Sequence, residues 1–112
     1  MSPRWWPSNP GHVIVVPNGH FADLVAIPED ELWAVYASAK RIAAALTQAR
    51  GCDGTSTRQH NGSGAGQDVF HFHVHVFPRF AGDGLYARDA EFRGASPEER
   101  APYAERLREV LQ

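Results

Sequence analysis

The pattern of hydrophobic and polar positions predicts a short strand followed by a long helix. Residues 13–16 form a β-branched run between Pro-Gly and Pro-Asn-Gly segments, which is typical of a buried or half-buried strand. Between residues 32 and 46, apolar side chains recur every three or four positions, as on one face of an amphipathic helix. Pro28 at the first helical position and Gly51 just past the end place this helix at about residues 28–50.

The second half of the chain predicts two more strands and a second helix. Residues 55–60 are rich in Thr and Ser and are expected to pair antiparallel with residues 69–77 across a glycine-rich loop. After a surface loop, Ser96 as N-cap, Pro97 in the first turn and Glu99 in a capping box begin a helix that ends at about Leu111. Residues 1–12 fit neither a helix nor a clean strand and are expected to be extended. Two helices and a small antiparallel sheet define an α+β domain.

Imidazole and apolar side chains alternate strictly from residue 70 to residue 76. On a strand, His71, His73 and His75 would share one face, about 6 to 7 Å apart along the chain. A substrate phosphate lying along this strand could contact two of them at once. The opposite face would supply the core with Phe70, Phe72, Val74 and Val76.

Three interpretations of these histidines differ in chemistry. They could be partly buried sheet residues without a function, but histidine is not a favoured strand residue and its ring nitrogens need partners. They could bind a catalytic zinc ion. Three same-face residues span about 13 Å on a straight strand, which hinders convergence on one ion, although a site using two of them with His12 or His60 stays open. In the third interpretation, one imidazole attacks phosphorus and its neighbours position the phosphate and the proton.

The segment before the histidines favours the third interpretation. Residues 62–66 read Gly-Ser-Gly-Ala-Gly, and such a loop can bring backbone N–H groups close to an anion in a concave nest. A glycine-rich loop alone is most often a hairpin connection. A glycine-rich loop that enters an alternating histidine strand is more specific, because it places a phosphate site beside an imidazole.

Composition and charge narrow the candidate partners. A chain of 112 residues fits one domain. Its net charge of −2 argues against a duplex nucleic-acid binder and leaves a small phosphorylated ligand as the better candidate. The single cysteine, Cys52, excludes an internal disulfide and a Cys-rich zinc site. Because no apolar run approaches the roughly 20 residues that span a bilayer, no membrane partner is expected and a cytoplasmic location is predicted.

The quoted motifs together resemble the histidine triad (HIT) family of nucleotide hydrolases and transferases. The matching segments are Pro10-Gly11-His12 with VIVVP and His20, then Asn61, then Ala65-Gly66-Gln67, then HFHVHVFPR. The resemblance covers about residues 9–80, with residues 81–112 as a C-terminal loop and helix. It implies a meander sheet with one long helix and a C-terminal helix, a homodimer, and no cofactor or metal.

The resemblance also implies a role for each motif residue. His73 would attack the α-phosphate and form a nucleotidyl-histidine intermediate. His75, Gly66, Gln67 and Asp68 would hold phosphate oxygens, with Asn61 nearby. His71 and His12 would belong to the supporting histidine cluster. Because His75 stands where the uridylyltransferase branch carries Gln, hydrolysis of a phosphoramidate or dinucleoside polyphosphate of a purine nucleotide is expected.

Two departures from the family pattern qualify these expectations. Only nine residues precede Pro10, and Arg4 stands about where relatives place a ribose-binding Asp. The domain therefore looks N-terminally short, weak base discrimination is expected, and the alternative is a nucleotide-binding or interaction protein with little or no turnover. Asp68 stands where many relatives have Ser or Thr, and its carboxylate would repel a phosphate unless compensated. His20 and His60 are interpreted as solvated or packed residues, Arg79 as a solvated or interface charge, and Cys52 as a bystander beside a helix end. Trp5 and Trp6 are interpreted as packing residues, with base stacking as the alternative.

Overall fold

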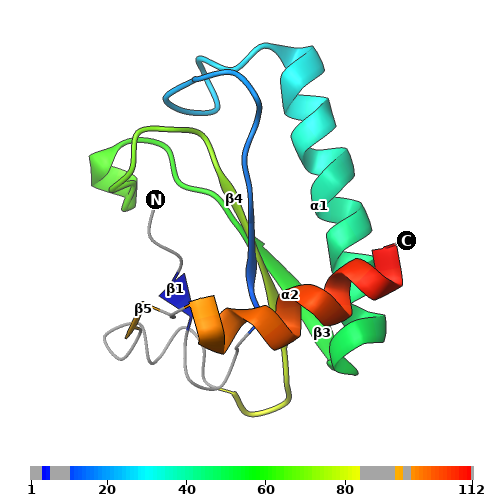
Figure 1. Cartoon of the computed structure of the whole chain (residues 1–112). Coiled ribbons are helices and arrows are strands. Elements are labelled where there is room, and N and C mark those ends of the chain that lie inside the picture. Colours follow the sequence, from blue (N-terminus) through cyan, green and yellow to red (C-terminus); the bar gives the residue numbers. More distant parts are fainter. Residues whose placement is uncertain (1–3, 6–10, 84–92, 95–96, 112) are drawn as a thin grey trace.

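The computed structural model describes residues 4–5, 11–83, 93–94 and 97–111 (Figure 1). A long helix lies along a small sheet, and a second helix lies near the C-terminal end of the first. The elements are, in chain order, β1 (Arg4–Trp5), β2 (Val13–Val15), α1 (Glu29–Arg50), β3 (Gly54–Arg58), η1 (Ser63–Ala65), β4 (Val74–Arg79), β5 (Arg93–Gly94) and α2 (Pro97–Leu111). The predicted α+β class is thereby confirmed.

The main sheet has three antiparallel strands in the order β2-β4-β3. The strand that carries the end of the histidine motif is therefore central. The expectation of a simple meander is wrong in this detail, because the last of the three strands in sequence lies between the other two. A separate two-stranded ladder pairs β1 with β5, so part of the segment expected to be irregular is a short strand.

Helix α1 begins one residue later than predicted. Pro28 has φ −64° and ψ 149° and is the extended N-cap rather than the first helical residue. Three acidic residues, Glu29 to Glu31, occupy the first turn, where negative charge favours the helix dipole. Gly51 ends the helix as predicted, with a left-handed φ of 63° and its N–H donating to the carbonyl of Thr47.

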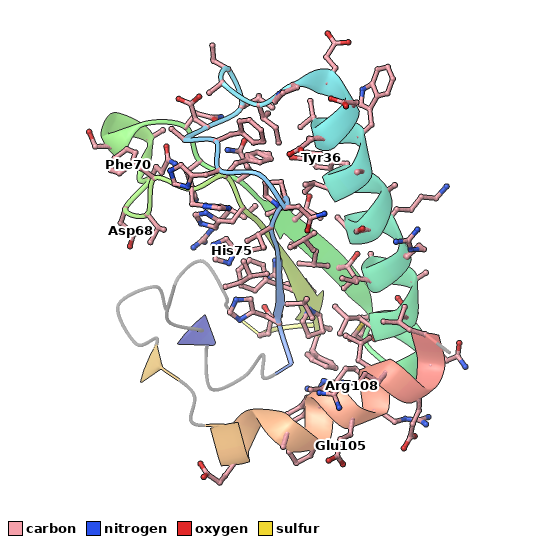
Figure 2. All side chains as sticks on the ribbon, turned by 45° about the horizontal axis from the view of Figure 1, so that its top comes forward. Tyr36, Asp68, Phe70, His75, Glu105 and Arg108 are labelled. Carbon is pink, nitrogen blue, oxygen red and sulfur yellow. The ribbon has the colours of Figure 1, made fainter. Side chains whose placement is uncertain are left out.

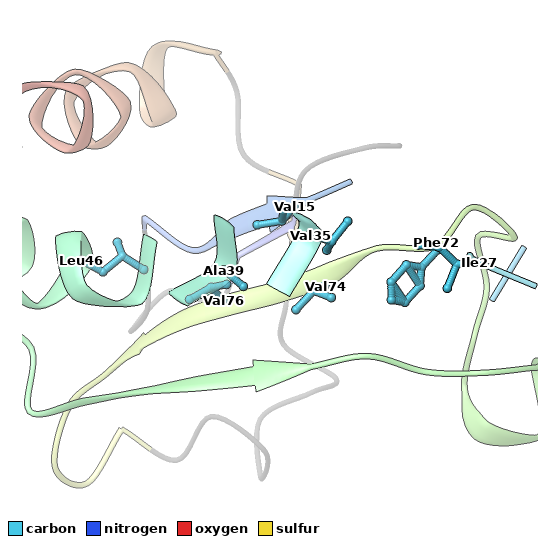
Figure 3. Close-up of a cluster of buried hydrophobic side chains, with 8 residues drawn as sticks. All are labelled: Val15, Ile27, Val35, Ala39, Leu46, Phe72, Val74 and Val76. Carbon is cyan, nitrogen blue, oxygen red and sulfur yellow. The ribbon is translucent and has the colours of Figure 1, made fainter. Parts of the chain in front are cut away.

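One face of the sheet is buried against α1 (Figure 3). Val74 and Val76 of β4 are fully buried and pack in one cluster with Val35, Ala39 and Leu46 of α1. The register pairs Val13 with Val76 and Val15 with Val74, so the α1 face of β2 belongs to the same core. Since successive residues alternate faces, His75 and Phe77 lie on the face away from α1.

The chain before Val74 is not the strand that the alternation predicted. Strand β4 begins at Val74 instead of residue 69, so His71 and His73 precede it. The backbone N–H of Phe72 donates to the carbonyl of Phe21 at 2.6 Å, which ties this stretch to the loop before α1. Phe72 is buried as expected, but Phe70 is 52% exposed and does not join the core.

Strand β3 ends at Arg58, two residues before the predicted end. Arg79, predicted to be a solvated or interface charge, forms a bidentate salt bridge with Asp83 at 2.8 Å and also donates to Ser56 Oγ at 3.0 Å. Cys52, interpreted as a bystander, is buried near the end of α1.

Helix α2 has the predicted bounds and packs on α1. Between them, the Arg50 guanidinium lies over the rings of Phe80 and Tyr103, at 5.2 and 4.8 Å from their centroids. Ser96, Trp6 and the side chains of Trp5 and Glu99 lie outside the described part of the structure. Within the described ranges, no helix is long and apolar enough to cross a membrane.

Candidate active site

The ring of His73 has a defined proton arrangement. Its Nδ1 lies 2.7 Å from the backbone carbonyl oxygen of His71. A carbonyl can only accept a hydrogen bond, so Nδ1 must carry the proton. In the neutral ring Nε2 therefore keeps its lone pair. His73 is 8% exposed, and few other orientations of the ring are compatible with this burial.

His75 lies between His73 and His12. The ring centroids of His73 and His75 are 5.0 Å apart, and those of His75 and His12 are 5.5 Å apart. His75 Nδ1 lies 3.4 Å from His12 Nε2, so one of these nitrogens donates a long hydrogen bond to the other. The Phe77 ring stacks with both His12 and His75. Three of the four predicted catalytic histidines therefore form one cluster.

His71 does not join that cluster through its side chain. Its Nδ1 lies 2.8 Å from Nδ1 of His20, in a pair whose ring centroids are 4.8 Å apart. The prediction that the His71 imidazole supports the cluster is therefore wrong, because the chain leaves strand geometry before Val74 and turns this ring toward His20. His71 contributes its carbonyl oxygen to His73 instead. His20, predicted to be solvated or packed, is its exposed partner.

Burial and neighbouring charges hold two imidazoles neutral. Burial, followed by His75 and Arg58, lowers the pKa of His12 from its usual 6.5 to about 3. Burial, followed by His73, Arg58 and His60, lowers the pKa of His75 to about 4, whereas Asp68 acts in the opposite direction. Both rings are thus uncharged at pH 7 and can donate or accept hydrogen bonds without adding positive charge.

Arg58 is a neighbour of the cluster that the sequence did not reveal. The β3–β4 register places it directly opposite His75, and its guanidinium carbon lies 5.5 Å from the centroid of the Phe77 ring. An arginine at the end of a Thr-rich strand gives no signal of this kind in sequence. Only the pairing of β3 with β4 places Arg58 beside His75.

The glycine-rich segment forms a short 3-10 turn, η1, between two glycines with positive φ. Gly62 has φ 84° and Gly66 has φ 90°, conformations that favour glycine. The N–H groups of Ala65 and Gln67 donate to the Gly62 carbonyl, and that of Gly66 donates to the Ser63 carbonyl. These groups close the turn, so the prediction that the N–H groups of Gly66 and Gln67 are aimed at a phosphate does not hold for this structure.

The side chain of Gln67 supports the turn rather than facing a ligand. It is 5% exposed. Its Oε1 accepts from Gly62 N–H at 2.7 Å, and its Nε2 donates to the carbonyls of Ala22 and Val69 at 2.6 and 3.0 Å. All of its amide groups are thus engaged with main chain. The predicted role of this side chain in holding phosphate is corrected to bracing the loop.

The remaining predicted ligand residues, Asn61 and Asp68, are exposed. Asn61 Oδ1 accepts from Leu24 N–H and from Gln59, each at 2.8 Å, and Asn61 Nδ2 donates back to Gln59 Oε1. Asp68 is exposed on the loop between η1 and β4, and its charge reaches His75 (Figure 2). His60 lies beside Gly66, since a Cβ built on this glycine would be 3.7 Å from His60 Nδ1.

The described residues place no group of three or more His, Cys, Asp or Glu side chains where it could hold a metal ion. The third ring that a three-histidine site on this motif would need is turned toward His20. The expectation of metal-independent chemistry stays a prediction.

Comparison of the sequence with models of known protein families identifies the family of this chain. Residues 5–82 match the HIT domain family, which spans more than two thirds of the chain and includes the described histidine cluster. The protein belongs to the histidine triad family.

Two curated relatives illustrate the range of this family. An uncharacterized HIT-like protein of Methanocaldococcus jannaschii is 36% identical over 93 residues, which are 83% of this chain and 71% of the relative. Adenylylsulfatase HINT3 of Arabidopsis thaliana is 32% identical over 84 residues, 75% of this chain and 43% of that protein. The chain thus spans less than half of the plant enzyme.

Solved structures agree with this assignment. A Zn-bound histidine triad family protein from Mycobacterium smegmatis is 31% identical with a TM-score of 0.76, covering 96% of this chain and 76% of that one. A Hit-like protein from Bartonella henselae is 28% identical with a TM-score of 0.80, covering 90% of this chain and 71% of that one.

Proposed function

We propose that this protein hydrolyses a nucleotidyl bond, as in a nucleoside phosphoramidate or a dinucleoside polyphosphate, through a covalent intermediate on His73. The observation that carries the proposal is the 2.7 Å contact from His73 Nδ1 to the His71 carbonyl. It leaves the Nε2 lone pair for attack. Purine nucleotides are the substrate class that we assign, on the basis of the family resemblance.

The reaction has two displacement steps. In the first, His73 Nε2 forms a bond to the α-phosphorus while the bond from phosphorus to the leaving group breaks, and the leaving atom takes the electron pair. For a phosphoramidate, the leaving nitrogen also takes a proton from solvent. In the second, water attacks phosphorus, the phosphorus–Nε2 bond breaks with its electron pair returning to Nε2, and the water proton passes to solvent.

The protein supports both steps through charge and orientation. When Nε2 bonds to phosphorus, the ring of His73 becomes cationic and its Nδ1–H binds the His71 carbonyl more strongly. His75 is adjacent and neutral at pH 7, so it can donate an N–H to a phosphate oxygen. We retain Asn61 and Asp68 as substrate-binding residues in this proposal, with Gly66 and Gln67 shaping their loop.

Turnover and trapping of the intermediate test this proposal together. Wild-type protein should release AMP from adenosine 5′-phosphoramidate, and His73→Ala should be slower by at least about a thousandfold. Mass spectrometry of the intact protein, quenched at alkaline pH, should show one nucleotidyl adduct on wild type and none on His73→Ala. Gln48→Ala is the control, because Gln48 is exposed on α1 and lies outside the cluster.

Two results would count against the reaction. Turnover by His73→Ala at most of the wild-type rate would show that His73 is not the nucleophile. Tight AMP binding by wild type without release of product from any phosphoramidate or dinucleoside polyphosphate would favour a nucleotide-binding protein instead.

We also propose that the protein is a homodimer. Helix α1 exposes Trp33 at 67% and Tyr36 at 41%, and large apolar side chains on a surface favour association. Sedimentation equilibrium should give twice the mass of the chain, and Trp33→Lys should shift the equilibrium toward monomer. A wild-type monomer at micromolar concentration would contradict this proposal.

A further inference from the structure

Arg58 approaches the histidine cluster from the neighbouring strand. It is the last residue of β3 and pairs in register with His75 of β4. Its guanidinium carbon lies 5.5 Å from the centroid of the Phe77 ring. That ring stacks with His12 at 4.8 Å and with His75 at 5.6 Å. One aromatic ring is therefore shared by a permanent cation and two imidazoles.

The contact between the two imidazoles limits how many protons they can hold. His12 Nε2 faces His75 Nδ1 at 3.4 Å, so one of these nitrogens must present a lone pair to the N–H of the other. If both rings were protonated, two N–H groups would face each other and the contact would break. The observed geometry therefore tolerates at most one added proton.

We propose that Arg58 is a positioning residue of this site, which opposes protonation of the His12–His75 pair and so helps to preserve the contact between the two rings. The inference rests on the proposed function, because a neutral His75 whose Nδ1 accepts from His12 carries its proton on Nε2 and can donate it to a phosphate oxygen. A guanidinium stays protonated at all physiological pH values. It raises the free energy of any second positive charge placed nearby.

Other titratable groups also face these two rings. His73 and His60, the latter after β3, lower the pKa of His75, whereas Asp68 on the loop raises it. His12 is influenced by His75 and Arg58. Arg58 lowers the pKa of both rings, as burial does. Removing the Arg58 charge should therefore raise the pKa of both His12 and His75, whereas a substitution of Asp68 should change the pKa of His75.

The test is an NMR titration of the histidine Cε1–H resonances, assigned with His12→Gln and His75→Gln variants. In wild type, the His12 and His75 resonances should stay nearly constant between pH 7 and pH 5. In Arg58→Met, both midpoints should rise by roughly one pH unit, so a titration continued from pH 5 to pH 4 should shift both resonances at higher pH than in wild type. Arg58→Lys keeps the charge and should resemble wild type.

Arg41→Met is the matched control, because it removes the same charge from an exposed position on α1. The proposal is wrong if Arg58→Met titrates like Arg41→Met. If Arg58→Met does not fold, Arg58→Gln is titrated in its place. Loss of folding in both variants would show a purely structural role and overturn the proposal. The titration does not depend on turnover. Its result for Arg58 can therefore be distinguished from the test of the proposed function, which is AMP release by wild type.

Discussion

The side-chain oxygen of Gln67 accepts a hydrogen bond from the backbone N–H of Gly62 at 2.7 Å. This bond spans the turn that precedes the histidines, and the amide nitrogen of the same side chain reaches the carbonyls of Ala22 and Val69. One buried glutamine thus joins the loop before α1 to the loop before β4.

Gln67→Leu should therefore destabilise the protein by about 2 to 4 kcal/mol, since it leaves three partly buried main-chain groups without this partner. Urea denaturation measures this change. Gln48→Leu is the matched control on an exposed position of α1 and should stay within about 0.5 kcal/mol of wild type. Equal stabilities of the two variants would contradict the bracing role.

His71→Ala should retain turnover within about tenfold of wild type, whereas His73→Ala should lose at least about a thousandfold. The reason is that His71 holds His73 through its main-chain carbonyl, which alanine keeps, while its imidazole contacts His20. Initial rates of AMP release distinguish the two variants. A loss on substitution of His71 as large as that on substitution of His73 would restore the His71 imidazole to the catalytic cluster.

Stability should decrease as the pH is lowered from about 6.5 toward 4. His12 and His75 have pKa values of about 3 and 4 in the folded protein, below the usual 6.5. In this window the unfolded chain binds more protons than the folded protein, so the stabilisation present above pH 6.5 is lost as the pH falls. We expect a decrease of about 3 kcal/mol in the free energy of unfolding, after allowance for solvent screening at the partly exposed rings.

Urea denaturation at pH 7, 5.5 and 4 measures this dependence. Carboxylates contribute to the same curve at its acidic end, so the comparison is with His12→Gln/His75→Gln, in which the slope between pH 6.5 and 5 should be smaller. An unchanged slope in the double variant would assign the effect to other groups.

Asp68→Asn should lower the pKa of His75 further, the opposite of the effect expected for Arg58→Met. Its negative charge favours the protonated form of His75, and amide substitution removes that charge with little change of shape. The His75 Cε1–H resonance should then stay constant to a lower pH than in wild type. Glu105→Gln, on an exposed position of α2 (Figure 2), should leave the titration unchanged, and a similar titration in both variants would contradict the prediction.

Several features of this protein follow from local sequence alone. The bounds of α1 were predicted to within one residue at its start and correctly at its end, because Pro28 and Gly51 determine backbone dihedral angles locally. The bounds of α2 were predicted in the same way. The alternation of Val74 and Val76 with His75 was also correct, since the two faces of a strand are a property of the chain itself.

Tertiary contacts decided which histidines meet. The same alternation extends back to Phe70, but the hydrogen bond between Phe72 and Phe21 and the ring contact between His71 and His20 draw this stretch out of the strand. Arg58 became a neighbour of His75 through strand pairing, and Gln67 became a brace through its distant partner Ala22. Sequence periodicity describes one segment at a time. Pairing between segments depends on how each buries its apolar face and satisfies its polar groups, and these requirements are met only in the complete fold.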